Sequence, residues 1–238
     1  FFGGVFLEKK LNTSAKFFKF VFSKFNSGTI CLPEKGMQKI PDQLYKKLDE
    51  KSVLLNTDIK SVRDNILETK NGEKFQGEKI ILCSYAQDII SNKNLEYNTV
   101  LCYYFASNKI VEDSNYIYLF PEEKLINNIA ILSSISDSYS PKGITLFSVT
   151  VIGYLGDPEK IINDLQDRLS VIFKFKSGYF EYLKHFKIFK GTMKQNKNYI
   201  FNNLNQIKDY VISGEQTTNG SIDGAIKSGL IAARKILN

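Results

Sequence analysis

Apolar residues recur at helical spacing in two stretches near the start of the chain. They follow one another at intervals of three and four residues from Phe17 to Phe25, while lysine and serine fall mostly on the other side. This spacing predicts an amphipathic helix over 14–25 that packs on the core or lines a substrate site, with membrane-surface attachment as the alternative. A second stripe over 36–48 predicts another helix, because Pro41 falls in its first turn, where proline is tolerated.

Strand patterns dominate the next stretch. The apolar residues at 53–55 predict a short buried strand. The segment 78–83, whose last four residues are a continuous apolar run, predicts a central parallel strand. Between them, alternating residues at 58–62 and 66–69, with an Asn-Gly turn at 71–72, predict antiparallel hairpin structure.

The middle of the chain has the pattern of several strands followed by one helix. Asp157 provides an N-cap, Pro158 suits the first helical position and Glu159 places an acid in the first turn. Residues 174–200 are rich in aromatic residues and lysine but show only a weak pattern. The predicted strands are 98–106, 115–120, 127–134 and 143–152.

The C-terminal segment predicts a strand, a loop and a helix, at 210–213, 214–220 and 221–237. The first turn of this helix carries few side chains, so free N–H groups and the positive end of the helix dipole face the loop. Such a helix start suits an anionic or carbonyl-rich ligand, and close packing of strand on helix is the alternative. The residues expected to point inward are Ile222, Ala225, Ile226, Gly229, Ala233 and Leu237.

Composition places the chain among ordinary globular proteins. It has 238 residues, 43% of them hydrophobic and 24% charged, and no apolar run approaches the roughly 18–20 residues of a membrane-spanning helix. The net charge is +7, but only three of the 32 basic residues are arginine and the lysines are scattered among acids. Because arginine is the residue that reads phosphates and bases bidentately, we expect no nucleic-acid partner.

The sequence shows no metal-binding or disulfide pattern. Cys31, Cys83 and Cys102 are an odd number without Cys-x-x-Cys spacing, which favours a reducing, cytoplasmic compartment. The single histidine, His185, has no carboxylate at ligand spacing, so we interpret it as a surface or hydrogen-bonded residue.

The C-terminal segment resembles the flavin motif of the FAD-dependent amine oxidase and phytoene desaturase superfamily. That motif is an apolar strand, Gly-Asp or Gly-Glu, a short loop and Gly-Ser-x-x-Gly-Ala-x-x-Ser-Gly-x-x-Ala-Ala. A second block, 32–44, is similar to the family's Gly-Met helix and is followed by the strands predicted above, and 134–146 is a weaker match. The matching positions are Gly214, Glu215, Gly220, Ser221, Gly224, Ala225, Ser228, Gly229, Ala232 and Ala233.

The resemblance implies an α/β fold: an incomplete glutathione-reductase-like FAD-binding domain with a mixed α+β substrate domain. The FAD-binding part would be discontinuous, at 29–93 and 200–238, with the substrate domain at 1–28 and 94–199. Glu215 would bond the ribityl or pyrophosphate region of FAD, and Ile59 would meet the adenine through its backbone. The implied cofactor-binding residues are Ile59, Gly214, Glu215, Gly220, Ser221, Ile222, Asp223 and Ala225.

The chain departs from the family in one respect. No pair of glycines is spaced Gly-x-Gly, so the fingerprint Gly-x-Gly-x-x-Gly that binds the pyrophosphate is missing, and FAD binding by this chain alone should be weak or absent. We therefore expect a truncated product or fragment of an oxidoreductase that passes hydride from an apolar or amine substrate to flavin. No catalytic residue can be assigned.

Two kinds of protein partner are expected. One is a separate N-terminal half that completes the flavin site, in which case the chain is a non-catalytic subunit. Another is a second copy of the chain, because an uncovered apolar face favours oligomers. The alternative function for the chain is that of a lysine-rich surface binder of nucleic acid or anionic membrane.

Overall fold

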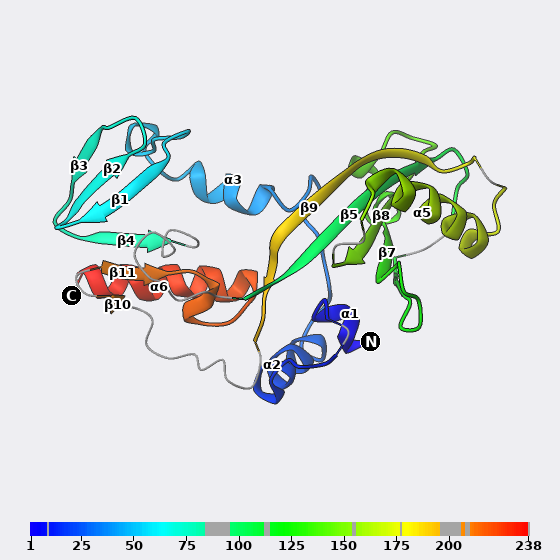
Figure 1. Ribbon diagram of the computed structural model, residues 1–238, viewed down its shortest axis with the longest axis horizontal. Helices are drawn as coiled ribbons and strands as arrows, with labels where there is room; N and C mark the ends of the chain where they lie inside the picture. Colours follow the sequence, from blue (N-terminus) through cyan, green and yellow to red (C-terminus); the bar gives the residue numbers. More distant parts are fainter. Residues whose placement is uncertain are drawn as a thin grey trace. The chain divides into compact units, whose positions relative to one another are not determined.

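The computed structural model describes residues 1–8, 10–83, 96–111, 115–153, 156–176, 178–195, 206–207 and 210–237 (Figure 1). The chain forms two compact units. The larger unit comprises Phe1–Asn12, Val21–Lys46 and Tyr97–Thr192, and the smaller unit comprises Thr13–Phe20, Lys47–Glu96 and Met193–Asn238. These ranges differ from the predicted domains at 13–20, 29–46, 94–96 and 193–199, and the functional division stays a prediction.

The larger unit is built on an antiparallel sheet that buries one face under helix α5. Alternate residues of its central strands, such as Tyr103, Phe105 and Phe147, are fully buried, and Leu165 and Leu169 of α5 meet them in one core. Each such side chain contributes about 1.5–3 kcal/mol by leaving water. The strand order is β6 (Ile117–Leu119), β7 (Asn128–Ile131), β8 (Thr145–Ile152), β5 (Tyr97–Ser107) and β9 (Glu181–Met193).

Helix α5 (Pro158–Phe173) begins as its sequence predicts. The Asp157 carboxylate accepts a hydrogen bond of 3.1 Å from the Glu159 N–H, and Pro158 takes the first helical position. The helix ends at Lys174, whose left-handed conformation (φ 55°) turns the chain away.

The smaller unit places two parallel strands under one helix. Strand β11 pairs in parallel with β4, Tyr210 opposite Ile80 and Ser213 opposite Cys83, which confirms the parallel strand predicted at 78–83. Among the described strands, however, β4 has a neighbour on one side only, so its central position is not seen. The elements are β10 (Gln206–Ile207), β11 (Tyr210–Ser213), β4 (Ile80–Cys83), helix α6 (Ile222–Leu237) and the meander β1 (Ile59–Arg63), β2 (Ile66–Thr69) and β3 (Lys74–Gln76).

One strand prediction was wrong and another was too long. Residues 53–55 form no strand, because Asn56 adopts a left-handed turn (φ 56°) and Leu54 and Leu55 remain 60% and 69% exposed. The strand expected over 127–134 stops at Ile131 and becomes a short helix. Strand β9 arises where no clear pattern was found. The remaining helices are α1 (Phe2–Val5), α2 (Ala15–Phe25), α3 (Lys39–Tyr45), α4 (Leu132–Ile135), η1 (Glu50–Ser52), η3 (Asp137–Tyr139) and η4 (Glu215–Thr217).

The face that α6 turns inward was also predicted incorrectly. Small residues spaced four apart, Gly224, Ser228 and Ala232, are buried. A stripe of large apolar residues points away from that seam instead. This α6 stripe consists of Ile222, Ile226, Leu230 and Leu237, which are 52%, 49%, 58% and 84% exposed.

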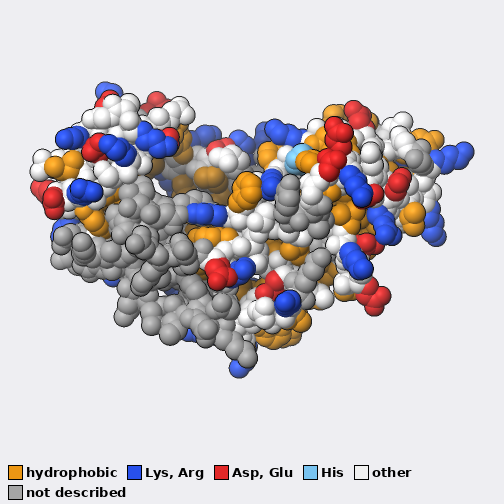
Figure 2. Space-filling view, viewed as in Figure 1, with side chains coloured by type: hydrophobic (Ala, Val, Ile, Leu, Met, Phe, Trp, Pro, Cys, Tyr) orange, Lys and Arg blue, Asp and Glu red, His pale blue; other side chains and the backbone are white. Residues whose placement is uncertain are grey.

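Basic and acidic side chains are interspersed over the surface that Figure 2 shows, as the sequence predicts. No described helix combines the length and apolarity that crossing a bilayer requires.

Candidate functional site

A pair of serines fixes the end of β11 to α6. The hydroxyl of the buried Ser228 accepts a hydrogen bond of 2.8 Å from the Gly214 N–H and lies 3.1 Å from the Ser213 hydroxyl. The same hydroxyl donates to the Ala225 carbonyl at 2.6 Å. These bonds position the loop that leaves the strand.

Glycine is required where this loop begins. Gly214 has φ +139°, a backbone conformation that residues with a side chain rarely adopt. A Cβ there would lie 2.3 Å from Oε1 of Gln216. The buried Gln216 amide donates to the Ser213 carbonyl at 3.2 Å, and the Thr217 hydroxyl donates to the Gly214 carbonyl at 2.9 Å. Hydrogen bonds between its own residues therefore stabilise the turn.

Ser221 caps α6. Its hydroxyl accepts from the Gly224 N–H at 2.9 Å, the bond expected of an N-cap serine, and it also bonds the Asn219 side chain. The Ser221 N–H donates to the Asn219 carbonyl at 2.8 Å, and the Gly220 N–H donates to the Gln195 side chain at 3.1 Å. Both amides are thus engaged inside the protein, so neither is open to a ligand.

The next two amides are open. The N–H groups of Ile222 and Asp223 donate to no residue that the structure describes. They lie in the first turn of a helix of 16 residues, where the dipole adds roughly half a positive charge. This part of the helix start can accept an anionic or carbonyl oxygen.

Glu215 adds a carboxyl to the same loop. The side chain is partly buried, and its carboxyl forms neither a hydrogen bond nor an ion pair with any described residue. Burial raises its pKa, because the charged form loses water without gaining a partner. A ligand hydroxyl would supply the missing donor.

The other predicted residues differ in their surroundings. Ala225 lies in the first turn of α6, and its N–H donates to the Ser221 carbonyl at 2.9 Å. Ile59 lies on β1, opposite Thr69, within the meander. It packs against the core of the smaller unit, which consists of Val62, Ile80, Leu82, Tyr210 and Ile212.

Two amide side chains that hold the loop were missed. Gln216 is 2% exposed and Gln195 is 4% exposed, and each fills the space that a glycine leaves. Gln216 lies two residues after Gly214, and this closeness in the sequence could have indicated that its side chain holds the loop. Gln195 is 25 residues from its partner Gly220, and nothing in the sequence links them.

The fold has counterparts among solved structures. A UDP-galactopyranose mutase in its reduced form superimposes with a TM-score of 0.60 at 13% identity, over 71% of this chain and 42% of that one. The PF1083 protein from Pyrococcus furiosus gives 0.61 at 17% identity, over 84% and 52%. The chain thus spans about half the length of these structures, and the likeness concerns a mixed helix-and-sheet fold.

The sequence places the chain within a family. The family model described as flavin containing amine oxidoreductase matches residues 1–237, and no curated protein matches at a significant level. The chain belongs to this family of flavin-containing amine oxidoreductases. The resemblance drawn from its C-terminal motif is confirmed.

Proposed function

We propose that this chain is the C-terminal part of an FAD-dependent oxidoreductase that acts on an apolar or amine substrate. The family supports the class of reaction. The observation that carries the cofactor assignment is the pairing, on one loop, of the unpartnered Glu215 carboxyl with the open amides of Ile222 and Asp223. FAD offers both hydroxyls and anionic oxygens.

The residues fit the cofactor in part. The Glu215 carboxyl would accept a hydrogen bond from a ribityl hydroxyl, and the amides of Ile222 and Asp223 would donate to a pyrophosphate oxygen or a ring carbonyl. FAD, when bound, supplies the hydride acceptor, and the protein orients the substrate and excludes water. Gly-x-Gly-x-x-Gly is absent from the sequence, so most of a pyrophosphate site is missing.

A partner would complete the site. Parallel sheets are normally covered on both faces, yet Ile81 of β4 is 38% exposed and the α6 stripe is uncovered by any described residue. The matched part of this chain covers only 42% and 52% of the two solved structures. These observations support an N-terminal half with the glycine fingerprint as the partner, and a chain that binds FAD weakly by itself.

The amide of Ile222 provides the test. Proline is favoured at the first helical position, so Ile222→Pro removes one N–H while preserving the helix. Ile222→Ala removes the same apolar side chain but keeps the N–H, which makes it the matched control. In equilibrium dialysis against FAD near millimolar concentration, we expect the proline variant to bind about tenfold more weakly than the alanine variant, as for a lost bond to a charged group.

Circular dichroism would verify that both variants keep their helix content. Equal FAD binding by the two variants would refute the assignment of the amide, and no binding by the parent chain would refute the site. If the purified parent chain carried stoichiometric flavin, the proposal that its FAD site is incomplete without a partner would be contradicted.

A further inference from the structure

Strand β9 forms an edge of the sheet in the larger unit (Figure 1). It pairs with β5 on one side and with no described strand on the other. The strand is 13 residues long, whereas edge strands that avoid association are commonly very short. A long row of main-chain N–H and C=O groups therefore faces away from the sheet.

One contact shows which of these main-chain groups point outward. The Thr99 hydroxyl of β5 donates to the Phe189 carbonyl at 3.3 Å, so this carbonyl points toward β5. Because the main-chain groups of successive strand residues point to opposite edges, those of Phe186 and Ile188 point away from β5. Another extended chain can pair with such groups and add a strand to the sheet.

The side chains along this edge are largely apolar and uncovered. Successive residues of a strand point to opposite faces, so Ile188 and Phe189 lie on opposite faces of β9. An added strand could therefore cover apolar side chains on both faces. The large apolar residues of β9 that are between 44% and 65% exposed are Leu183, Phe186, Ile188 and Phe189.

Three lysines alternate with these apolar side chains. Lys184 lies over the Phe186 ring, 4.8 Å from its centroid, and Lys187 lies over the Phe189 ring at 4.7 Å. Lys190 lies over a tyrosine ring of β5 at 5.5 Å. An aromatic ring attracts an ammonium group without neutralising its charge, so the edge is positive on both faces.

This charge determines which occupant fits the edge. Glu181 is the only acidic residue of β9, so two copies of the strand paired edge to edge would bring lysines together, and like charges destabilise paired strands. A strand with acidic side chains is attracted by the same lysines. Nucleic acid and anionic membrane are attracted too, but they offer no extended row of N–H and C=O groups for the main chain of β9.

We propose that β9 binds an extended acidic segment of another protein, which adds a strand to the sheet. The main chain of the segment pairs with the outward groups of β9, and its carboxylates meet Lys184, Lys187 and Lys190. The site lies within the larger unit and requires no flavin, so it does not depend on the function proposed for the loop of the smaller unit.

Fluorescence anisotropy of synthetic peptides with the full chain tests this site. The probe is a rhodamine-labelled peptide of about ten residues in which glutamate and valine alternate. One control peptide carries lysine in place of glutamate. The other is methylated on every backbone nitrogen, so it keeps the charge but donates no main-chain hydrogen bond. We expect the glutamate peptide to bind about tenfold more tightly than either control, with weaker binding at high salt.

Two pairs of variants locate the binding on β9. Lys184→Glu should weaken binding of the glutamate peptide several-fold, whereas Lys160→Glu makes the same change on α5 and should alter it little. Ile188→Pro removes one outward N–H and should bind several-fold more weakly than Ile188→Ala, which loses the same apolar side chain but keeps the N–H. Circular dichroism would verify that the variants keep their secondary structure.

Several results would overturn the proposal. These are no binding of the glutamate peptide, equal binding of either control peptide, or an effect of Lys160→Glu as large as that of Lys184→Glu. Equal binding by Ile188→Pro and Ile188→Ala would exclude main-chain pairing at this residue and overturn it as well. Tighter binding of a single-stranded oligonucleotide of equal charge, or of phosphatidylserine vesicles, would replace the acidic segment with nucleic acid or membrane as the occupant.

Discussion

At the scale of single residues, two tyrosines show how the sheet of the larger unit treats polar groups. The Tyr103 ring is fully buried and stacks on His185 with 5.0 Å between centroids, and its hydroxyl finds no hydrogen-bond partner among the described residues. The Tyr182 hydroxyl, in contrast, lies 2.6 Å from Nδ1 of the same histidine. Burial raises the pKa of Tyr103, so the hydroxyl stays neutral. Burying this neutral group without a hydrogen bond costs free energy of folding.

Removing these two hydroxyls should have opposite effects. Tyr103→Phe deletes an unpaired buried group and should raise the free energy of unfolding by about 1 kcal/mol, whereas Tyr182→Phe deletes a bonded one and should lower it by about 1 kcal/mol. Urea denaturation followed by far-UV circular dichroism would measure both, since the chain has no tryptophan. A Tyr103→Phe protein less stable than its parent would show that the hydroxyl has a partner.

At the scale of elements, α6 shows that the distance between a helix and the strand it packs on determines which residues fit on the buried face. Gly224, Ser228 and Ala232 form the buried seam because the helix lies close to β11, where a larger side chain would not fit. A Cβ at Gly224 would lie 2.0 Å from the Asn219 carbonyl oxygen, while a Cβ at Gly229 would meet nothing within 4 Å.

These two glycines form a matched pair. Gly224→Ala must displace the backbone of the loop and should destabilise the protein by about 1–3 kcal/mol, the usual cost of overpacking. Gly229→Ala adds a methyl group in open space and should stabilise the helix by about 0.5–1 kcal/mol. Thermal unfolding of the two variants and the parent would test this prediction. If all three proteins unfolded at the same midpoint temperature, the loop would tolerate the displacement that Gly224→Ala requires.

Local signals explain which elements the sequence predicted. The cap Asp157, the proline after it and the Asn-Gly turn act within a few residues, and the helix and strands they mark are present. The inner face of α6 was assigned wrongly because periodicity finds a stripe of large apolar residues but cannot tell whether another element covers it. Strand β9 was missed since it is defined by pairing with β5, far away in sequence.

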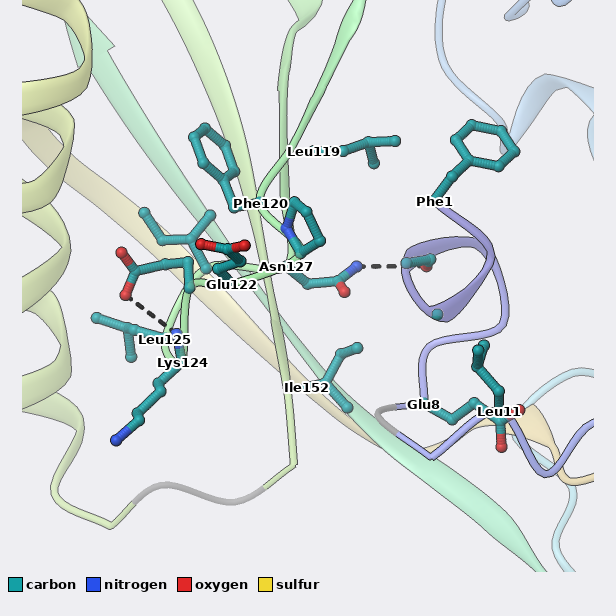
Figure 3. Close-up of a pocket in the computed structure, with 15 residues that line it drawn as sticks. Phe1, Glu8, Leu11, Leu119, Phe120, Glu122, Lys124, Leu125, Asn127 and Ile152 are labelled. Carbon is teal, nitrogen blue, oxygen red and sulfur yellow. Dashed lines mark hydrogen bonds between the residues drawn. The ribbon is translucent and has the colours of Figure 1, made fainter.

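At the scale of the molecule, the glycine pattern of 214–225 predicted a strand, a loop and a helix, together with the family, because it reflects backbone geometry within one segment. A cavity of about 390 Å³ in the larger unit was not predicted (Figure 3). Its walls include Phe1, Gly4, Leu119 and Ile152, which only the folded chain brings together. Sites made of one segment are visible in a sequence, whereas sites assembled from several are not.

The uncovered α6 stripe determines how the isolated chain should behave in solution. Its four large apolar residues lie along one helix, and such a surface drives association when no partner covers it. We expect sedimentation velocity to show self-association that increases with protein concentration.

Introducing charge with Ile226→Lys and Leu230→Lys together should reduce this self-association markedly. Val171→Lys replaces an apolar residue of α5 that is 74% exposed, also within a helix, and should change little. A parent chain that sediments as a single monomer at all concentrations would show that the stripe needs no cover, and an equal effect of Val171→Lys would show that added charge alone disperses the protein.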